Sequence, residues 1–235
     1  TGGTIDKMES IPNLKVSLEK DAFINQVNKI GLAVIGQSEG LAPADKKLYA
    51  LRDVTGTVDS IPLIASSVMS KKLASGAQAI LLDVKVGSGA FMKNIEDARE
   101  LAKAMVDIGN GNGRSVKAIL TDMDRPLGHA IGNALEIREV INTLKGHGPE
   151  DLTHECIIMA AHMLVLSRMC DYETALNRVQ QALDSGAALE RLRLMIEAQG
   201  GDSRVINDES ILIIGQFTYD VIAPQDGYII HMNTI

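Results

Sequence analysis

A hydroxyl and an ammonium group share one helical stripe in this sequence. Ser67 and Lys71 fall at the spacing of one helix face together with Ile64 and Val68. An unpaired charge on a partly apolar surface is costly, so Lys71 needs a partner or a ligand. If the loop that carries Arg52 folds back over this helix, two cations and a hydroxyl would surround a small planar acceptor. The alternatives are that Lys71 extends into water from the last helical turn and that Arg52 forms a local ion pair.

A second set of polar residues accompanies the apolar run LLDVKVGSG. Asp83 and Lys85 fall on one face of the strand that this run predicts, because strand side chains alternate. They either form a structural pair or brace a site, and the sequence leaves both possibilities open. The Gly-Ser-Gly turn at 87–89 would let a ligand approach the backbone closely. The Thr-Gly-Gly-Thr turn at 1–4 suits an anion, although such turns are common in ordinary loops.

The sequence lacks the residue motifs of several other kinds of active site. The sequence has no Ser-His-Asp set, no Walker loop and no GxGxxG fingerprint, and we expect no organic cofactor. His154 and His162 are not at the HExxH spacing of a zinc helix.

Composition argues against two kinds of partner. A formal net charge of -7 and 3% aromatic residues disfavour nucleic acid, whose binding needs a basic face or stacking rings. No apolar run reaches the roughly 18 residues of a membrane span. Cys156 and Cys170 lack metal-site spacing, and we expect two buried free thiols in a reducing cytoplasm.

The helix that carries Ser67 and Lys71 has clear end signals. Ser60 is a suitable N-cap, Pro62 is tolerated in the first turn and Gly76 is a suitable C-cap, which predicts a helix over 61–75. Shorter helices are predicted at 21–30 and from about Pro43, and a short strand at 31–36.

The central part of the chain alternates between strand and helix patterns. Apolar runs at 79–89 and 115–123 predict two buried strands that end in turns, with an amphipathic helix between them and another helix at 133–144. This order predicts an α/β fold with a central mixed, mostly parallel sheet flanked by helices. Right-handed crossovers would place the ends of both strands on one rim.

The sequence pattern of the rest of the chain changes twice. Residues 149–199 predict three helices, and after a break near Gly200–Asn207 an alternating pattern predicts strands around a Pro-Gln-Asp-Gly turn. We therefore assign 1–200 to a central domain and 201–235 to the beginning of a β-rich, α+β C-terminal domain. The chain begins at Thr1 within a turn, and we take it as a fragment of a longer protein.

Four segments together resemble one family. TGGTIDKMESIP, LAPADKKLYALRDVTGTVDSIPLIASSVMSKKLA, LLDVKVGSGAFM and LTDMDRPLGHAIGNALE are similar to the thymidine and pyrimidine-nucleoside phosphorylases, in register over essentially the whole chain. The resemblance implies a small helical domain and a main phosphate loop upstream of Thr1. Whether the chain is active by itself therefore stays open.

The resemblance implies a glycosyltransferase reaction at the cationic cluster. Inorganic phosphate would attack the sugar carbon of uridine, thymidine or deoxyuridine, and the pyrimidine would leave as an anion. Arg52, Ser67 and Lys71 match the base-binding set. Two fixed cations would stabilise the leaving base more in the transition state than in the ground state. Apolar side chains would line the pyrimidine ring, and these are Ile64, Val68 and Phe91.

The resemblance also implies a phosphate contact, an ion and an assembly. Thr4 matches a phosphate-binding residue, and Leu127, Ala130 and Glu139 match potassium ligands, most of them backbone oxygens. Phosphate is then a co-substrate, the protein is cytoplasmic, and a homodimer would form through the upstream domain.

Other functions remain as alternatives. The segments MDRPLGHAIGNALE and LKGHGPEDL are more similar to the broad-specificity enzyme than to a thymidine-restricted phosphorylase, which is one alternative. A phosphoribosyltransferase that acts on anthranilate has a related fold but would need an acidic magnesium cluster, which the sequence does not suggest. A non-catalytic nucleoside-binding fragment is the alternative from another class.

Overall fold

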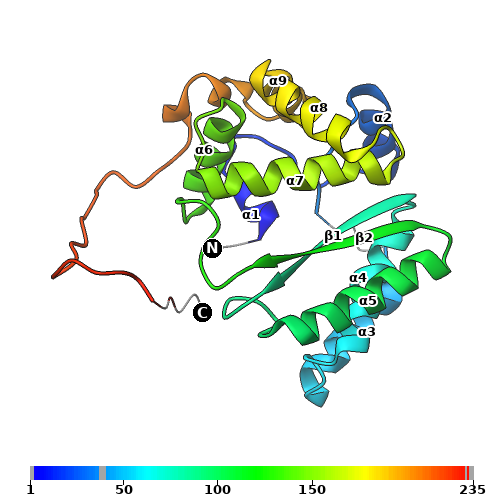
Figure 1. The fold of residues 1–235 in the computed structure, drawn as a ribbon. Helices are drawn as coiled ribbons and strands as arrows, with labels where there is room; N and C mark the ends of the chain where they lie inside the picture. Colours follow the sequence, from blue (N-terminus) through cyan, green and yellow to red (C-terminus); the bar gives the residue numbers. More distant parts are fainter. Residues whose placement is uncertain (1–2, 37–40, 231, 233–235) are drawn as a thin grey trace. The chain divides into compact units, whose positions relative to one another are not determined.

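The computed structural model describes residues 3–36, 41–230 and 232. The chain divides into two compact units, each assembled from separate segments (Figure 1). Unit 1 comprises Thr1–Gln37, Gly128–Cys156 and Arg178–Tyr228, and unit 2 comprises Ser38–Leu127, Ile157–Asn177 and Ile229–Ile235.

Unit 2 is built on two parallel strands. β1 (Ala79–Val86) pairs with β2 (Ser115–Asp122) from Ala79 opposite Ser115 to Val86 opposite Asp122. α4 (Ile61–Ala74) and α5 (Ile95–Gly111) lie on one side of this pair, and α3 (Pro43–Thr55) lies beside α4 (Figure 1). The predicted α/β class and the parallel pairing of the two strands are confirmed.

The core of unit 2 follows from the alternation along β1. Ile80, Leu82 and Val84 are buried and pack against the α4 and α5 side chains, with Met69 completely buried among them. Asp83 and Lys85 lie on the opposite face, as the period of two predicts. This packing fixes which side of α4 faces the core and which side remains for other contacts.

The end signals of α4 place that helix within one residue of the prediction. Ile61–Ala74 forms the helix, Pro62 lies in its first turn, and Gly76 follows with φ +82°, a conformation that glycine adopts without strain. The Ser60 side chain makes no cap hydrogen bond. The expectation that Arg52 lies in a loop was wrong, because α3 continues to Thr55 before Gly56 ends it in a left-handed turn.

Unit 1 is helical among its described residues. The core buries Ile11, Ile141, Met195 and Ile196. Its helices are α1 (Thr4–Met8), α2 (Lys20–Ile30), α6 (Asn133–Leu144), α9 (Ala187–Ala198), η1 (Ser203–Ile206) and η2 (Glu209–Ile211). The ranges of both units share α7 (Glu150–Leu166) and α8 (Tyr172–Asp184), which with α9 confirm the three helices predicted over 149–199.

Two strand predictions were wrong for the described residues. Segment 31–36 has no strand partner there, and the Gln199 side chain instead bonds both backbone groups of Val34, at 3.2 Å to its N–H and 2.9 Å to its C=O. The described part of 212–232 also contains no strand. An isolated hairpin is at most marginally stable in water, and the apolar side chains of this stretch, such as Phe217 and Tyr228, are exposed.

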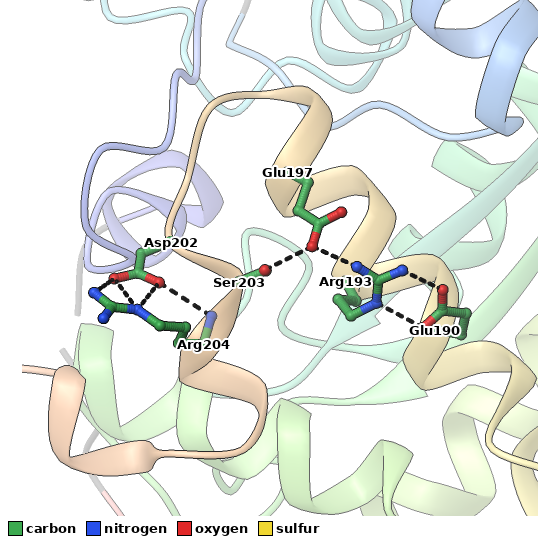
Figure 2. A network of polar contacts seen from close by, with 6 residues as sticks. All are labelled: Glu190, Arg193, Glu197, Asp202, Ser203 and Arg204. Atoms are coloured by element: carbon green, nitrogen blue, oxygen red, sulfur yellow. Dashed lines mark hydrogen bonds and ion pairs between the residues drawn. The ribbon is translucent and has the colours of Figure 1, made fainter.

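The segment after α9 still belongs to the core of unit 1. Ser203 donates to Glu197 at 2.8 Å (Figure 2). Val205 and Ile206 are buried beside α6 and α9. Compact packing therefore continues past the break predicted near Gly200–Asn207. The assignment of 201–235 to a separate β-rich domain stays a prediction.

The cysteines differ from the prediction. Cys156 is exposed and Cys170 is half-buried, so the expectation of two buried thiols was wrong. Both lie outside the two hydrophobic cores, because α7 and the turn after it turn these positions toward solvent.

Candidate functional site

Two helix faces meet at the predicted base site in unit 2. Asp45, Tyr49 and Arg52 recur at i, i+4 and i+7 on α3, while Ser67 and Lys71 lie four residues apart on α4. The Lys71 ammonium lies 3.1 Å from a carboxylate oxygen of Asp45 and 3.4 Å from the Ser67 hydroxyl. Asp45 and Ser67 are buried, whereas Lys71 is about one-third exposed at its side chain.

Arg52 organises the connection between the two helices. Its guanidinium donates to the backbone carbonyls of Thr57 and Leu63, each at 3.4 Å, and of Val58. A guanidinium has five N–H groups, and these bonds use three of them. Arg52 is therefore buried, at 6% exposure, by a loop that it holds in place.

Tyr49 lies beside both cations. The Arg52 guanidinium carbon is 5.1 Å and the Lys71 ammonium 5.8 Å from the centre of its ring. Cations at this distance from an aromatic face are attracted by the ring quadrupole. Arg52 and Lys71 thus lie beside one ring, and Ser67 joins them through its hydrogen bond with Lys71.

The predicted apolar wall has two kinds of member. Ile64 and Val68 are half-buried and pack against the core of unit 2. Phe91 is 67% exposed. It follows the turn that ends β1.

Asp45 and Tyr49 were missed by reasoning from the sequence. The signal was present, because both stand at helical spacing from Arg52 within the helix predicted from about Pro43. Treating Arg52 as a loop residue hid this face. Continuing the helix by three turns would have found it.

The Asp83–Lys85 pair forms on the face of β1 opposite to α4 and α5. Its charged atoms are 2.9 Å apart, and both side chains are about 30% exposed, so the pair is less buried than the sequence suggested. Thr121 on β2 also donates to Asp83. These contacts link the two strands near their shared rim.

The Gly-Ser-Gly turn joins the two strand ends. Gly87 has φ +138°, and a Cβ there would come within 2.6 Å of the Asp124 backbone nitrogen. Ser88 N–H donates to the Asp124 carboxylate at 2.7 Å, and Gly89 N–H donates to the Met123 carbonyl at 3.0 Å. Glycine is thus required here for contact with the segment after β2.

Unit 1 holds two of the predicted potassium residues side by side. One oxygen of Glu139 accepts from the backbone N–H groups of His129 at 2.9 Å and Ala130 at 3.0 Å. Ala130 and Glu139 line a cavity of ≈ 680 Å³ together with Arg138 and His147. Leu127 belongs to unit 2.

Asp151 fixes the start of the same loop. Its carboxylate accepts from the N–H groups of Leu152 at 2.8 Å and Gly128 at 3.2 Å. The Leu152 bond is the main reason that the pKa of Asp151 lies below its usual value. Thr4, the predicted phosphate contact, is the exposed first residue of α1.

Comparison with known proteins identifies the family. Residues 1–189 match the family described as glycosyl transferase family, a/b domain, and the chain belongs to that family. The pyrimidine-nucleoside phosphorylases of Geobacillus stearothermophilus and Bacillus subtilis (strain 168) are each 55% identical to it over 230 residues, covering 97% of this chain and 53% of each relative. That of Staphylococcus aureus (strain bovine RF122 / ET3-1) is 54% identical over the same length.

These comparisons confirm the resemblance found in the sequence. They also show that the chain spans about half the length of the curated relatives it matches. Among the described residues, no helix combines the length and apolar character needed to cross a membrane.

Proposed function

We propose that the protein containing this chain catalyses the reversible phosphorolysis of pyrimidine nucleosides, releasing the free base and ribose 1-phosphate or deoxyribose 1-phosphate. The position of Arg52 and Lys71 beside Tyr49, with Ser67 bonded to Lys71, carries this proposal. Relatives at 55% identity are named pyrimidine-nucleoside phosphorylase, which supports it further.

Electrostatics explains what the cluster does in such a reaction. As the bond between sugar and base breaks, negative charge grows on the pyrimidine and spreads to its carbonyl oxygens. In this proposal Arg52 and Lys71 would face that charge, and Ser67 would bond the ring edge near N3. Groups that are already fixed in place stabilise developing charge without reorganising, so they lower the barrier rather than only tightening binding.

Arg52 suits this role because it is already immobilised. Its bonds to Thr57 and Val58 before α4 and to Leu63 on α4 hold the guanidinium plane before any substrate arrives. The half-buried side chains of Ile64 and Val68 would border the ring, and the exposed Phe91 would cover it. An apolar border excludes water and strengthens each charge interaction.

The remaining parts of the proposal rest more on resemblance. Thr4 would contribute to the binding of phosphate, which acts as co-substrate. Carbonyl and carboxylate oxygens suit a hard cation, and the neighbouring Ala130 and Glu139 of unit 1 would contribute to holding potassium. Leu127 is assigned to the same ion by the resemblance alone. When bound, the ion would supply a fixed positive charge. We further propose a cytoplasmic homodimer.

The test is release of uracil and thymine from uridine and thymidine, with and without phosphate, in potassium and in sodium buffer. Both the 235-residue chain and the longest protein that contains it are assayed. We expect phosphate-dependent release from both nucleosides by the longer protein.

Three other results would change the proposal. Release from thymidine alone would indicate a restricted phosphorylase. Tight binding of nucleosides without release would indicate a binding protein. If the folded longer protein neither binds nor releases a pyrimidine, the assignment of the cluster to a pyrimidine is overturned.

A further inference from the structure

A buried carboxylate stands behind the proposed base site. Asp45 is only 9% exposed, lies on the first turn of α3, and pairs with Lys71 at 3.1 Å. A buried charge without a partner is strongly unfavourable, so Asp45 and the Lys71 ammonium depend on each other.

The geometry of the ammonium group shows what this pair can do. Lysine carries three N–H donors at the end of a flexible four-carbon stem. Asp45 at 3.1 Å and the Ser67 hydroxyl at 3.4 Å accept from the Lys71 ammonium. Among the described residues these acceptors take two of the donors, which leaves the third for an acceptor in the site.

The two contacts come from different helices, which matters for precision. Ser67 lies on the same helix as Lys71, whereas Asp45 lies on α3. A single contact from its own helix would let the lysine stem swing into water, because its side chain is already 34% exposed. The second contact, from α3, fixes the position of the ammonium between the helices.

We propose that Asp45 is the positioning residue of Lys71, directing its one remaining N–H toward a pyrimidine carbonyl oxygen. This inference rests on the proposed function. Asp45 does not touch the substrate, and its whole effect on the reaction passes through Lys71.

The carboxylate also has an electrostatic effect on the reaction rate, and its sign is opposite to that of positioning. A nearby negative charge weakens the field of the ammonium at the leaving base. If this weakening dominated, removing the carboxylate would raise kcat. If positioning dominates, removal lowers kcat, because the ammonium no longer meets the growing charge.

The experiment is a double-mutant cycle in the longest protein that contains this chain. Phosphate-dependent release of uracil from uridine is measured for the unaltered protein, Asp45→Asn, Lys71→Ala and the double variant. We expect Asp45→Asn to lower kcat/KM by about tenfold to a hundredfold, mainly through kcat, since a displacement of roughly 1 Å has effects of this size. In the Lys71→Ala background the same change should have less than about a twofold effect.

Two further variants keep the test decisive. Asp45→Glu retains the carboxylate, should recover part of the activity, and replaces Asp45→Asn in the cycle if that variant does not fold. Asp107→Asn removes an exposed ion pair with Lys103 on α5 and should leave kcat/KM unchanged.

The outcomes separate the two proposals. The role of Asp45 alone is overturned if the unaltered protein is active and the losses of Asp45→Asn and Lys71→Ala multiply in the double variant. It is also overturned if Asp45→Asn raises kcat. If the unaltered protein shows no phosphate-dependent release, the proposed function and this role are overturned together.

Discussion

Two groups of charged residues on this chain look similar in their contacts and differ in their surroundings. Between α3 and α4, Lys71 bonds the buried Asp45 and Ser67. Along α9, Arg193 lies between Glu190 and Glu197, and Ser203, the first residue of η1, extends the network (Figure 2). The second group has more hydrogen bonds, but its side chains are between one-third and one-half exposed.

The exposed group perturbs its own titration without gaining much stability. The Ser203 bond and then Arg193 lower the pKa of Glu197, and Glu190 and Glu197 raise the pKa of Arg193. Water already stabilises exposed charges, so such pairs add little to folding and are screened by salt. Burial, rather than the number of contacts, therefore decides which group matters for function and stability.

Removing the cations of the α3–α4 site should have the largest effect. We expect Lys71→Ala and Arg52→Ala each to lower kcat at least a hundredfold, which corresponds to about 2.7 kcal/mol of transition-state stabilisation. Phosphate-dependent uracil release measures this in the full-length protein. Lys72→Ala, on the next position of α4, is the matched control and should change kcat less than about twofold. Unchanged activity of Lys71→Ala and Arg52→Ala would remove both residues from the site.

Breaking the buried pair should also reduce the free energy of unfolding. Asp45→Asn leaves the Lys71 ammonium without its carboxylate, and loss of a charged hydrogen bond costs about 1–3 kcal/mol. The value lies below that of a fully buried pair, because Lys71 is 34% exposed and water can solvate it. Chemical denaturation at neutral pH measures the change. A loss no larger than that of the exposed-pair variant Asp107→Asn would contradict the argument from burial.

A third pair, of intermediate burial, should show its effect only as a dependence on pH. His162 on α7 stacks on Tyr172 with ring centres 4.7 Å apart, and the Lys117 ammonium lies 3.0 Å from its Nδ1. Burial, and then the charge of Lys117, lower the pKa of His162 in the folded chain.

The sign of the pH effect follows from this lowered pKa. Between the folded and the unfolded pKa the unfolded chain binds more protons, so the contribution of His162 is complete above about pH 6.5 and is lost as the pH falls toward the folded pKa. We expect His162→Gln to remove this part of the slope of unfolding free energy against pH. His154→Gln, at an exposed position of the same helix, should keep it. An identical slope in the His162 variant would assign the pH dependence to other groups.

A contrast between local and distant contacts explains what the sequence could predict. The helix 61–74 and both strands have end signals and periodicity within their own residues, and they were predicted within a few positions. The segment at 31–36 was not, because its backbone is satisfied by Gln199, which lies far along the chain. Apolar character at 31–36 says that the segment is buried, but not which group bonds it.

The candidate site divides in the same way. Ser67 and Lys71 could be found from spacing on one helix, but the partner of Lys71 comes from α3. Only the packing of α3 on α4 brings Asp45 to that ammonium, and no pattern within either helix specifies it. The contact of Glu139 with Ala130 likewise came from resemblance, since a backbone N–H leaves no mark on residue type.

The smallest effect is expected from the Arg193 network. Arg193→Ala removes its bonds to Glu190 and Glu197, yet the melting temperature should fall by less than about 2 °C, and the difference should vanish in about 1 M salt. Because the folded pKa values of both glutamates are lowered, this small contribution is present above their usual pKa and is lost as the pH falls through the folded values. Thermal unfolding at pH 7 and pH 3 measures it, with Lys103→Ala at an exposed position of α5 as control. A larger loss that persists in high salt would mean that contact number outweighs burial on this chain, and the ranking of the two charged groups would reverse.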